Sequence, residues 1–300
     1  MTHLDLSALT TESRNPRTEE LDAMSTLDLV RAMNDEDRRV ADAVAVALPQ
    51  IAEAVDAIAT QLRKGGRLIY VGAGTSGRLG VLDAAECPPT FSADPRQVRG
   101  LIAGGPNAFL RAVEGAEDDP ALAASDLEQL DLRAKDVVVG IASSGRTPYV
   151  LGALRYAEKQ GAVTIALTCN AGSPASSAAK IAIEVVTGPE IITGSTRLKA
   201  GTATKMVLNM LTTGAFVRLN KTYGNLMVDL QASNEKLVAR SVTIVGSATG
   251  KSREEAERAL GECDGEVKTA IVALQKGVDP ATARTLLFHC TGSVREALGS

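Results

Sequence analysis

From Arg67 to Gly188, short apolar runs alternate with longer stretches that have helical patterns. The runs are rich in β-branched residues: RLIYVG, VRGLIAG, DVVVGIA, AVTIALT and IAIEVVTG. Between them lie segments such as GRLGVLDAAE, NAFLRAVEGA, TPYVLGALRYAEKQG and SPASSAAK, which we predict to be helical. Continuous apolar strands that alternate with helices are typical of a parallel sheet covered on both faces. We therefore predict an α/β fold, a three-layer αβα sandwich with a five-stranded parallel sheet.

Helical patterns flank this core on both sides. A capping box at Ser25 predicts a short helix over 26–34. Apolar residues every three or four positions over 40–62 predict a second helix, kinked or split at Pro49. A long helix is expected at about 196–220, and short helices follow. The predicted parts are an N-terminal arm with helices that pack on the core (1–65), the sheet domain (66–233) and a small C-terminal helical region (234–300).

Composition excludes several classes of protein. A net charge of −4 with interspersed signs leaves no basic patch, so we expect no nucleic-acid partner. No apolar run reaches the length of a membrane span and the N-terminus lacks a signal-peptide pattern, so we predict a cytoplasmic protein with no membrane partner. The two histidines lie near the chain ends and the four cysteines are far apart. These positions argue against a metal site or a Ser–His nucleophile in the main body.

The stretch LIYVGAGTSGRLGVLDAAECPPT contains three glycines, Gly72, Gly74 and Gly77, that fit the pattern G-x-G-x-x-G. The loop follows a strand and precedes a helix, which suits either a dinucleotide or a smaller phosphate, because helix N-terminal amides bind phosphate. A dinucleotide site also needs an acidic residue at the end of the second strand, but that strand reads VRGLIAGG. The sequence therefore favours a phosphomonoester and predicts no cofactor.

The third strand ends in a second hydroxyl-rich loop, ASSGRTP, with Ser143, Ser144 and Thr147. Turns at the carboxyl ends of parallel strands meet in one crevice, where hydroxyls and amides can hold a phosphate without a metal. Ser144 and Thr147 could also cap the following helix, which begins at a proline. Two arginines that follow the loop glycines, Arg78 and Arg146, could pair with phosphate or with a carboxylate.

The pairing of G-x-G-T-S with S-S-G-x-T resembles the SIS (sugar isomerase) domain family, whose members bind phosphosugars. Longer strings resemble one branch of it, the bacterial N-acetylmuramic acid 6-phosphate etherases, from about residue 10 to the C-terminus: GAGTSGRLGVLDAAECPPT, AVEGAED, GIASSGRTPYV, TGSTRLKAGTATKMVLNML and GNLMVDLQASNEKL. Ala142 departs from the wider family, in which serine is common there, so one hydroxyl contact is missing.

This resemblance implies a carbon–oxygen lyase of cell-wall sugar recycling. Such an enzyme cleaves the C3 lactyl ether of N-acetylmuramic acid 6-phosphate and releases N-acetylglucosamine 6-phosphate and D-lactate. The resemblance also implies a homodimer and a C-terminal region like the ubiquitin-associated (UBA) three-helix fold. We expect the sugar phosphate to bind the two loops and the opening of the long helix, at Gly74, Thr75, Ser76, Ser143, Ser144, Gly145, Thr147 and Lys199.

The chemistry of such a cleavage needs few groups. In the open-chain sugar a base removes the C2 proton, the C3 oxygen leaves, and water adds back, without a metal or redox cofactor. Since the main body has no histidine, carboxylates are the natural acid and base. The resemblance assigns the acid to Glu86 and a second catalytic carboxylate to Glu117.

Glu86 raises a question of distance. We expect its helix to end before Pro88, where the negative helix end and apolar neighbours would raise the pKa of Glu86. A helix from Gly77 to Glu86 is ~15 Å long. Either the sugar extends that way, or the chain turns back, or a partner subunit supplies Glu86. Two alternative functions stay open on the residues alone: a phosphosugar isomerase, although these commonly use histidine, and a non-enzymatic phosphosugar-sensing regulatory module.

Overall fold

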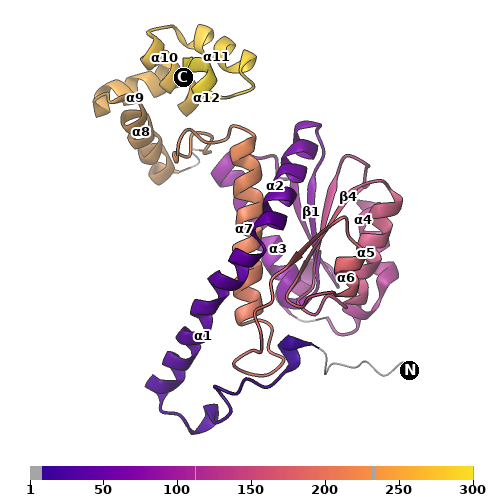
Figure 1. Ribbon diagram of the computed structural model, residues 1–300. Helices are drawn as coiled ribbons and strands as arrows, with labels where there is room; N and C mark the ends of the chain where they lie inside the picture. The colour runs from indigo at the N-terminus through magenta and orange to yellow at the C-terminus, as the bar shows by residue number, and fades with distance from the viewer. Residues whose placement is uncertain (1–8, 112, 232–233, 300) are drawn as a thin grey trace. The chain divides into compact units, whose positions relative to one another are not determined.

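The structure is a computed structural model that describes residues 9–111, 113–231 and 234–299 (Figure 1). Five strands form one parallel sheet in the order β2-β1-β3-β4-β5. Burial on both faces explains why β1 and β3 are apolar at every position. The predicted α/β fold with a five-stranded parallel sheet is confirmed. The strands are β1 (Leu68–Gly72), β2 (Val98–Ile102), β3 (Val137–Ile141), β4 (Val163–Thr168) and β5 (Ile181–Glu184).

Strand order places a crevice at the carboxyl ends of β1 and β3. From β1 the chain moves to β2 on one side, then crosses to β3 on the other side of β1. The connections that leave β1 and β3 therefore run in opposite directions. Open parallel sheets bind ligands at such a reversal, outside the carboxyl ends of the strands. Both glycine-containing loops begin there.

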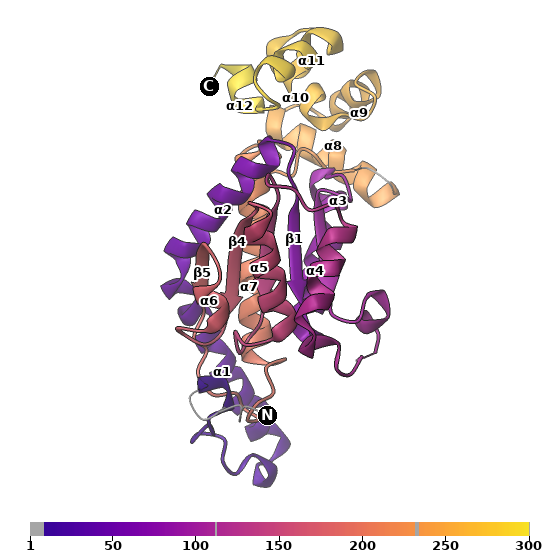
Figure 2. The same ribbon diagram turned by 90° about the vertical axis from the view of Figure 1, so that its right-hand side faces the viewer.

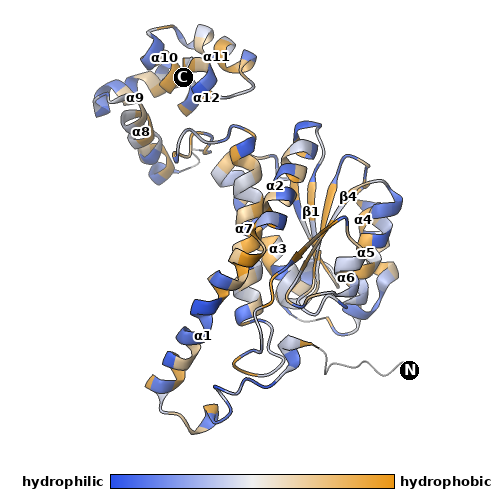
Figure 3. Ribbon diagram, in the orientation of Figure 1, coloured by the Kyte–Doolittle hydropathy of each residue, from blue (hydrophilic) through white to orange (hydrophobic). Residues whose placement is uncertain are grey.

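Helices cover both faces of the sheet (Figures 1 and 2). One face carries α4 (Pro120–Gln129), α5 (Pro148–Lys159) and α6 (Pro174–Ser177), and the other carries α2 (Leu48–Arg63), α3 (Gly74–Phe91) and α7 (Lys199–Arg218). Figure 3 shows the strands as the most continuous hydrophobic segments, with hydrophilic residues concentrated on the helices. This is the predicted three-layer αβα sandwich.

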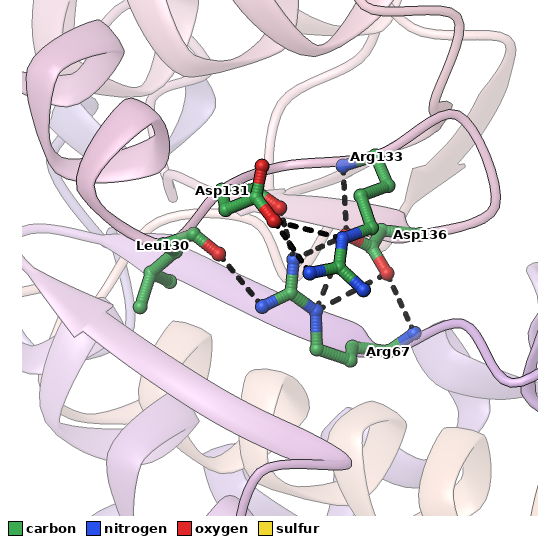
Figure 4. A network of polar contacts seen from close by, with 5 residues as sticks. All are labelled: Arg67, Leu130, Asp131, Arg133 and Asp136. Atoms are coloured by element: carbon green, nitrogen blue, oxygen red, sulfur yellow. Dashed lines mark hydrogen bonds and ion pairs between the residues drawn. The ribbon is translucent and has the colours of Figure 1, made fainter.

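At the amino ends of the strands, Arg67 connects the starts of β1 and β3 (Figure 4). The backbone N–H of Arg67 donates to Asp136 Oδ1 at 2.8 Å, and its guanidinium donates to the same carboxylate. The guanidinium also donates to the carbonyls of Leu130 and Asp131, each at 2.8 Å. Asp136 is fully buried. These bonds fix the register of the two strands whose other ends carry the loops.

The N-terminal helices differ from the prediction in where they break. Ser25 caps the first helix by accepting the N–H of Asp28 at 3.2 Å, as predicted. That helix, α1 (Thr26–Val46), is continuous, and the chain breaks at Ala47 rather than at Pro49. Proline lacks an N–H and fits the first turn of a helix, so α2 begins just before it. Within the described residues no single helix is long and apolar enough to cross a membrane, and α1 and α2 pass that test only as a pair bent by 62°.

The predictions for two other helices are wrong in part. The described residues of the stretch NAFLRAVEGA do not form an α-helix. Its described residues include only the end of a short 3₁₀ turn, η3 (Pro106–Phe109), and the start of another, η4 (Ala116–Asp118). Gly115 has φ of +75°, which a right-handed helix does not allow. By contrast, α3 does not end before Pro88 but continues to Phe91, whose ring stacks on Phe216 with centroids 4.6 Å apart. Glu86 therefore lies inside the helix, and the argument from a negative helix end is wrong.

By its contacts the chain divides into two compact units, Met1–Ala85 with Arg96–Thr212 and Glu86–Pro95 with Thr213–Ser300. In the second unit the helices α8 to α12 surround a core that includes Val245, Ala270 and Ile271. The short helices that the sequence predicts after the long one include α9, α10 and α11. The domain boundaries at 65 and 233, and the likeness to the UBA fold, stay predictions. The helices are α8 (Glu235–Thr249), α9 (Arg253–Glu262), α10 (Val267–Lys276), α11 (Pro280–His289) and α12 (Val294–Leu298).

Candidate functional site

The two hydroxyl-rich loops line one cavity of about 390 Å³ in the first unit. This volume falls within the ~300–1,000 Å³ of small-molecule sites. Among the described residues the loops contribute Ala73, Gly74, Thr75, Ser76, Ile141, Ala142, Ser143, Ser144, Arg146, Thr147 and Pro148. Of the predicted binding residues, the structure thus brings together Gly74, Thr75, Ser76, Ser143, Ser144 and Thr147.

The first loop is compact because its glycines lack side chains. A Cβ on Gly77 would lie 2.6 Å from the carbonyl oxygen of Gly72, so α3 starts directly against the end of β1. Thr75 and Ser76 are half-buried in the first turn of α3. Amides in a first helical turn have no carbonyl partner within the helix, and they favour an anion. The loop therefore offers hydroxyls and backbone donors on the same cavity wall.

The second loop depends on Gly145, which has φ of +65°. A Cβ there would lie 2.2 Å from Ser173 Oγ, so only glycine fits, and Gly145 shapes the loop without lining the cavity itself. Thr147 is the N-cap residue of α5, yet its side chain makes no capping bond. The capping alternative for Thr147 is wrong, and its hydroxyl is available to a ligand. Ser144 Oγ accepts the backbone N–H of Arg146 at 3.2 Å.

Arg146 supplies positive charge to the cavity. It is the only lysine or arginine among the described lining residues, and its Nε is buried with no hydrogen-bond partner in the described chain. A buried donor without a partner is costly, and an oxyanion would satisfy it. The guanidinium of Arg78 donates to the carbonyls of Ala108 and Phe109, each at 2.9 Å, and Arg78 lines a smaller cavity with Glu117. It holds the loop that follows β2.

Three carboxylates also line the cavity. Glu117 and Asp118 come from η4, and Glu12 comes from the N-terminal arm, at the end of the short turn η1 (Thr10–Glu12). Glu117 lines an adjoining cavity of about 190 Å³ as well, which shares Ala73 and Gly74 with the first. The structure therefore places Glu117, which sequence physics alone could not single out from its acidic neighbours, beside the hydroxyl loops. Sequence reasoning missed Glu12 because the arm has no periodic pattern.

Lys199, which was predicted to contact the sugar phosphate, lies in a buried ion pair. It is 1% exposed, its Nζ lies 2.6 Å from Glu36 Oε2, and it is not one of the described lining residues. Burial alone would raise the pKa of Glu36, but hydrogen bonds from Lys199 and Arg17 outweigh it and lower the pKa to about 2. Glu190 accepts the backbone N–H groups of Lys199 and Ala200, each at 2.9 Å, and so caps α7.

Glu86 is exposed, belongs to the second unit and does not line the cavity. The second unit has its own cavity of about 660 Å³, but the ammonium of Lys268, among its lining residues, is already paired with Asp229 at 2.8 Å. That cavity contains neither glycine loop. Within the described residues no group of three or more His, Cys, Asp or Glu side chains is arranged to hold a metal ion.

Family models match three segments of the chain. Residues 50–158 match the N-terminal SIS domain of glucokinase regulatory protein, and residues 119–214 match the SIS domain. Residues 224–263 match the C-terminal lid domain of glucokinase regulatory protein. Among solved structures, a phosphoheptose isomerase from Neisseria gonorrhoeae covers 63% of this chain and 98% of its own, with a TM-score of 0.48 and 19% identity.

Curated relatives are much more similar. The N-acetylmuramic acid 6-phosphate etherase of Streptomyces avermitilis is 58% identical over 296 residues, which cover 99% of this chain and 95% of the relative. The enzyme of the same name from Yersinia pestis is 59% identical over 295 residues, 98% of this chain and 100% of the relative. With such identity over nearly its whole length, the chain belongs to the N-acetylmuramic acid 6-phosphate etherase family.

Proposed function

We propose that this chain cleaves the C3 lactyl ether of N-acetylmuramic acid 6-phosphate in the recycling of cell-wall sugar. The products are N-acetylglucosamine 6-phosphate and D-lactate, and the enzyme is a cytoplasmic homodimer. One observation carries the proposal: a cavity of about 390 Å³ combines hydroxyls and an arginine with carboxylates, in a chain 58–59% identical to enzymes of that name.

The phosphate binds between the two loops. Ser76, Ser144 and Thr147 provide hydroxyls, the first turn of α3 provides amides, and Arg146 provides a charged donor. Hydrogen bonds to a charged group contribute about 1.5–3 kcal/mol each, so several of them anchor the substrate without a metal. Anchoring one end of the sugar holds the C2 and C3 atoms at a constant place relative to the carboxylates.

The reaction is an elimination followed by hydration. Glu117 removes the C2 proton of the open-chain aldehyde, the electron pair forms a C2–C3 double bond, and the C3–oxygen bond breaks. The departing lactate oxygen takes a proton from Glu86, and water then adds its hydroxyl to C3 and a proton to C2. The role of Glu117 is supported by its place in the cavity. The role of Glu86 rests on the family motif AAECPPT.

Release of D-lactate from N-acetylmuramic acid 6-phosphate tests the proposal. An isomerase or a sensor would release none. In deuterated water, Glu86→Gln should stop cleavage but still exchange deuterium into C2, whereas Glu117→Gln should lose both reactions. General acid–base steps are worth about 10²–10⁴-fold each. Glu128→Gln, an exposed change on α4, serves as the control and should behave as the parent. Normal cleavage by Glu86→Gln, or exchange at the parent rate by Glu117→Gln, contradicts the assigned roles.

A further inference from the structure

A buried asparagine docks the N-terminal arm on the second hydroxyl loop. Asn170 Oδ1 accepts the backbone N–H and the hydroxyl of Thr10, at 2.8 and 3.0 Å. Its Nδ2 donates to Thr11 Oγ1 at 3.1 Å and to the carbonyl oxygen of Ser143 at 2.9 Å. Asn170 is 3% exposed. One side chain thus joins the arm, directly before Glu12, to the loop that we propose for phosphate.

More bonds hold the arm around and beyond Glu12. The backbone N–H of Gly194 donates to the carbonyl of Thr11 at 3.2 Å, and the hydroxyl of Thr18 donates to the carbonyl of Ile191 at 3.0 Å. Arg17 Nε donates to Glu36 at 2.7 Å. Because the chain is anchored on both sides of it, Glu12 occupies a defined position in the cavity wall.

The carboxylate of Glu12 is placed against a glycine. A Cβ on Gly194 would lie 3.0 Å from Glu12 Oε2, so the absence of a side chain at Gly194 leaves this position free. The Glu12 side chain is half-buried, and within the described residues it has no ion-pair or hydrogen-bond partner. The Glu12 carboxylate lines the cavity, so a donor group of a ligand can replace the water that solvates it.

Charge decides which part of the ligand Glu12 can face. A phosphate is repelled by a carboxylate. The cavity already contains the carboxylates of Glu117 and Asp118, and Arg146 is the one arginine among its described lining residues. A sugar, in contrast, presents O–H groups and an acetamido N–H, which donate hydrogen bonds to carboxylates. Glu12 is therefore suited to the sugar part of the ligand and not to its phosphate.

We propose that Glu12 is a substrate-binding carboxylate of this site, which accepts hydrogen bonds from hydroxyl or amide groups of the sugar. It makes the N-terminal arm part of the binding site and a determinant of specificity for phosphosugars over inorganic phosphate. The inference rests on the proposed function, because it places the same substrate in the same cavity.

The test compares the affinities of two ligands, N-acetylglucosamine 6-phosphate and inorganic phosphate, measured by calorimetry at one salt concentration. Removing the charge of Glu12 relieves repulsion of the phosphate group in both ligands, so that effect cancels in the ratio of the two dissociation constants. Glu12→Gln should lower the preference for the sugar phosphate about tenfold, whereas Glu20→Gln, an exposed change on the same arm, should leave it unchanged. A purely structural role would weaken both ligands equally.

A second variant approaches the same contact from the other side. Gly194→Ala places a Cβ against the Glu12 carboxylate and should reduce the preference as Glu12→Gln does. Gly188→Ala is the control for backbone strain, because the φ of Gly188, +71°, is close to the +79° of Gly194. A Cβ on Gly188 would have no atom within 4 Å, so this change adds the strain without a contact. An unchanged ratio in both Glu12→Gln and Gly194→Ala, with D-lactate still released by the parent, overturns the inference and leaves the function standing. Binding of the sugar phosphate without D-lactate release by the parent overturns the function alone.

Discussion

Replacing Lys199 by methionine separates a structural role from a role in binding. The change keeps the aliphatic stem but removes an ammonium that lies 2.6 Å from Glu36, in a pair whose side chains are 2% and 3% exposed. Glu36 would keep Arg17 at 2.7 Å, on a half-exposed side chain. Loss of one partner of a buried ion pair costs ~3–5 kcal/mol of stability. Because Arg17 still pairs with Glu36, we expect a loss of ~3 kcal/mol. At ~2–4 °C per kcal/mol for a domain of this size, Tm should fall by ~6–12 °C.

Thermal unfolding followed by circular dichroism measures this loss. Lys205→Met, an exposed change on the same helix, should shift Tm by less than ~2 °C. The double variant Lys199→Met with Glu36→Leu should be less destabilised than the sum of the two single changes, since neither charge is then left buried alone. Below its Tm, Lys199→Met should bind N-acetylglucosamine 6-phosphate with the affinity of the parent. A variant that keeps the parent Tm and loses this affinity would refute the reasoning and restore the binding role predicted from the sequence.

Three more predictions concern the same unit. Gly145→Ala, whose Cβ would lie 2.2 Å from Ser173 Oγ, should weaken sugar phosphate binding at least tenfold by titration, whereas Gly172→Ala, with φ of +60° and open space, should not. The pKa of Glu36 is about 2, against an ordinary 4.5, so the ionised carboxylate stabilises the fold fully above pH 4.5 and this stabilisation is lost as the pH falls towards 2. Between pH 4.5 and pH 2, the Tm of Glu36→Gln should therefore fall less than the Tm of the parent. Arg78→Ala frees the loop after β2, so kcat for D-lactate release should fall about tenfold or more with little change in Tm.

The sheet was predictable because its signal is local. A run such as Val137–Ile141 is apolar at every position because both faces are covered, and no distant residue is needed to recognise it. The two loops were predictable because loops at the carboxyl ends of parallel strands share one end of the sheet. The strand order then places β1 next to β3. The helix end expected before Pro88 was wrong because packing of Phe91 on Phe216 outweighs the missing proline N–H groups, and local propensity does not include such contacts.

The remainder of the site depends on residues far apart in the chain. Lys199 and Glu36 are 163 positions apart, and nothing in STRLKAGTA distinguishes a buried ion pair from a group that faces a ligand. Glu12 reaches the cavity through bonds to Asn170, which is 160 positions from Thr10. Such pairs leave no periodic pattern in the sequence. The phosphate loops could therefore be located from the sequence, but Glu12 could not.

The bonds between the arm and Asn170 also have a consequence for synthesis of the chain. Thr10 and Thr11 are made 160 and 159 positions before the asparagine that holds them. At ~5–20 residues per second, the arm waits roughly ten to thirty seconds for its partner. A nascent chain that ends before residue 170 can contain both hydroxyl loops, yet it lacks the asparagine bridge that docks Glu12 beside them. Docking of the arm at the cavity therefore comes late, after residue 170 has been translated.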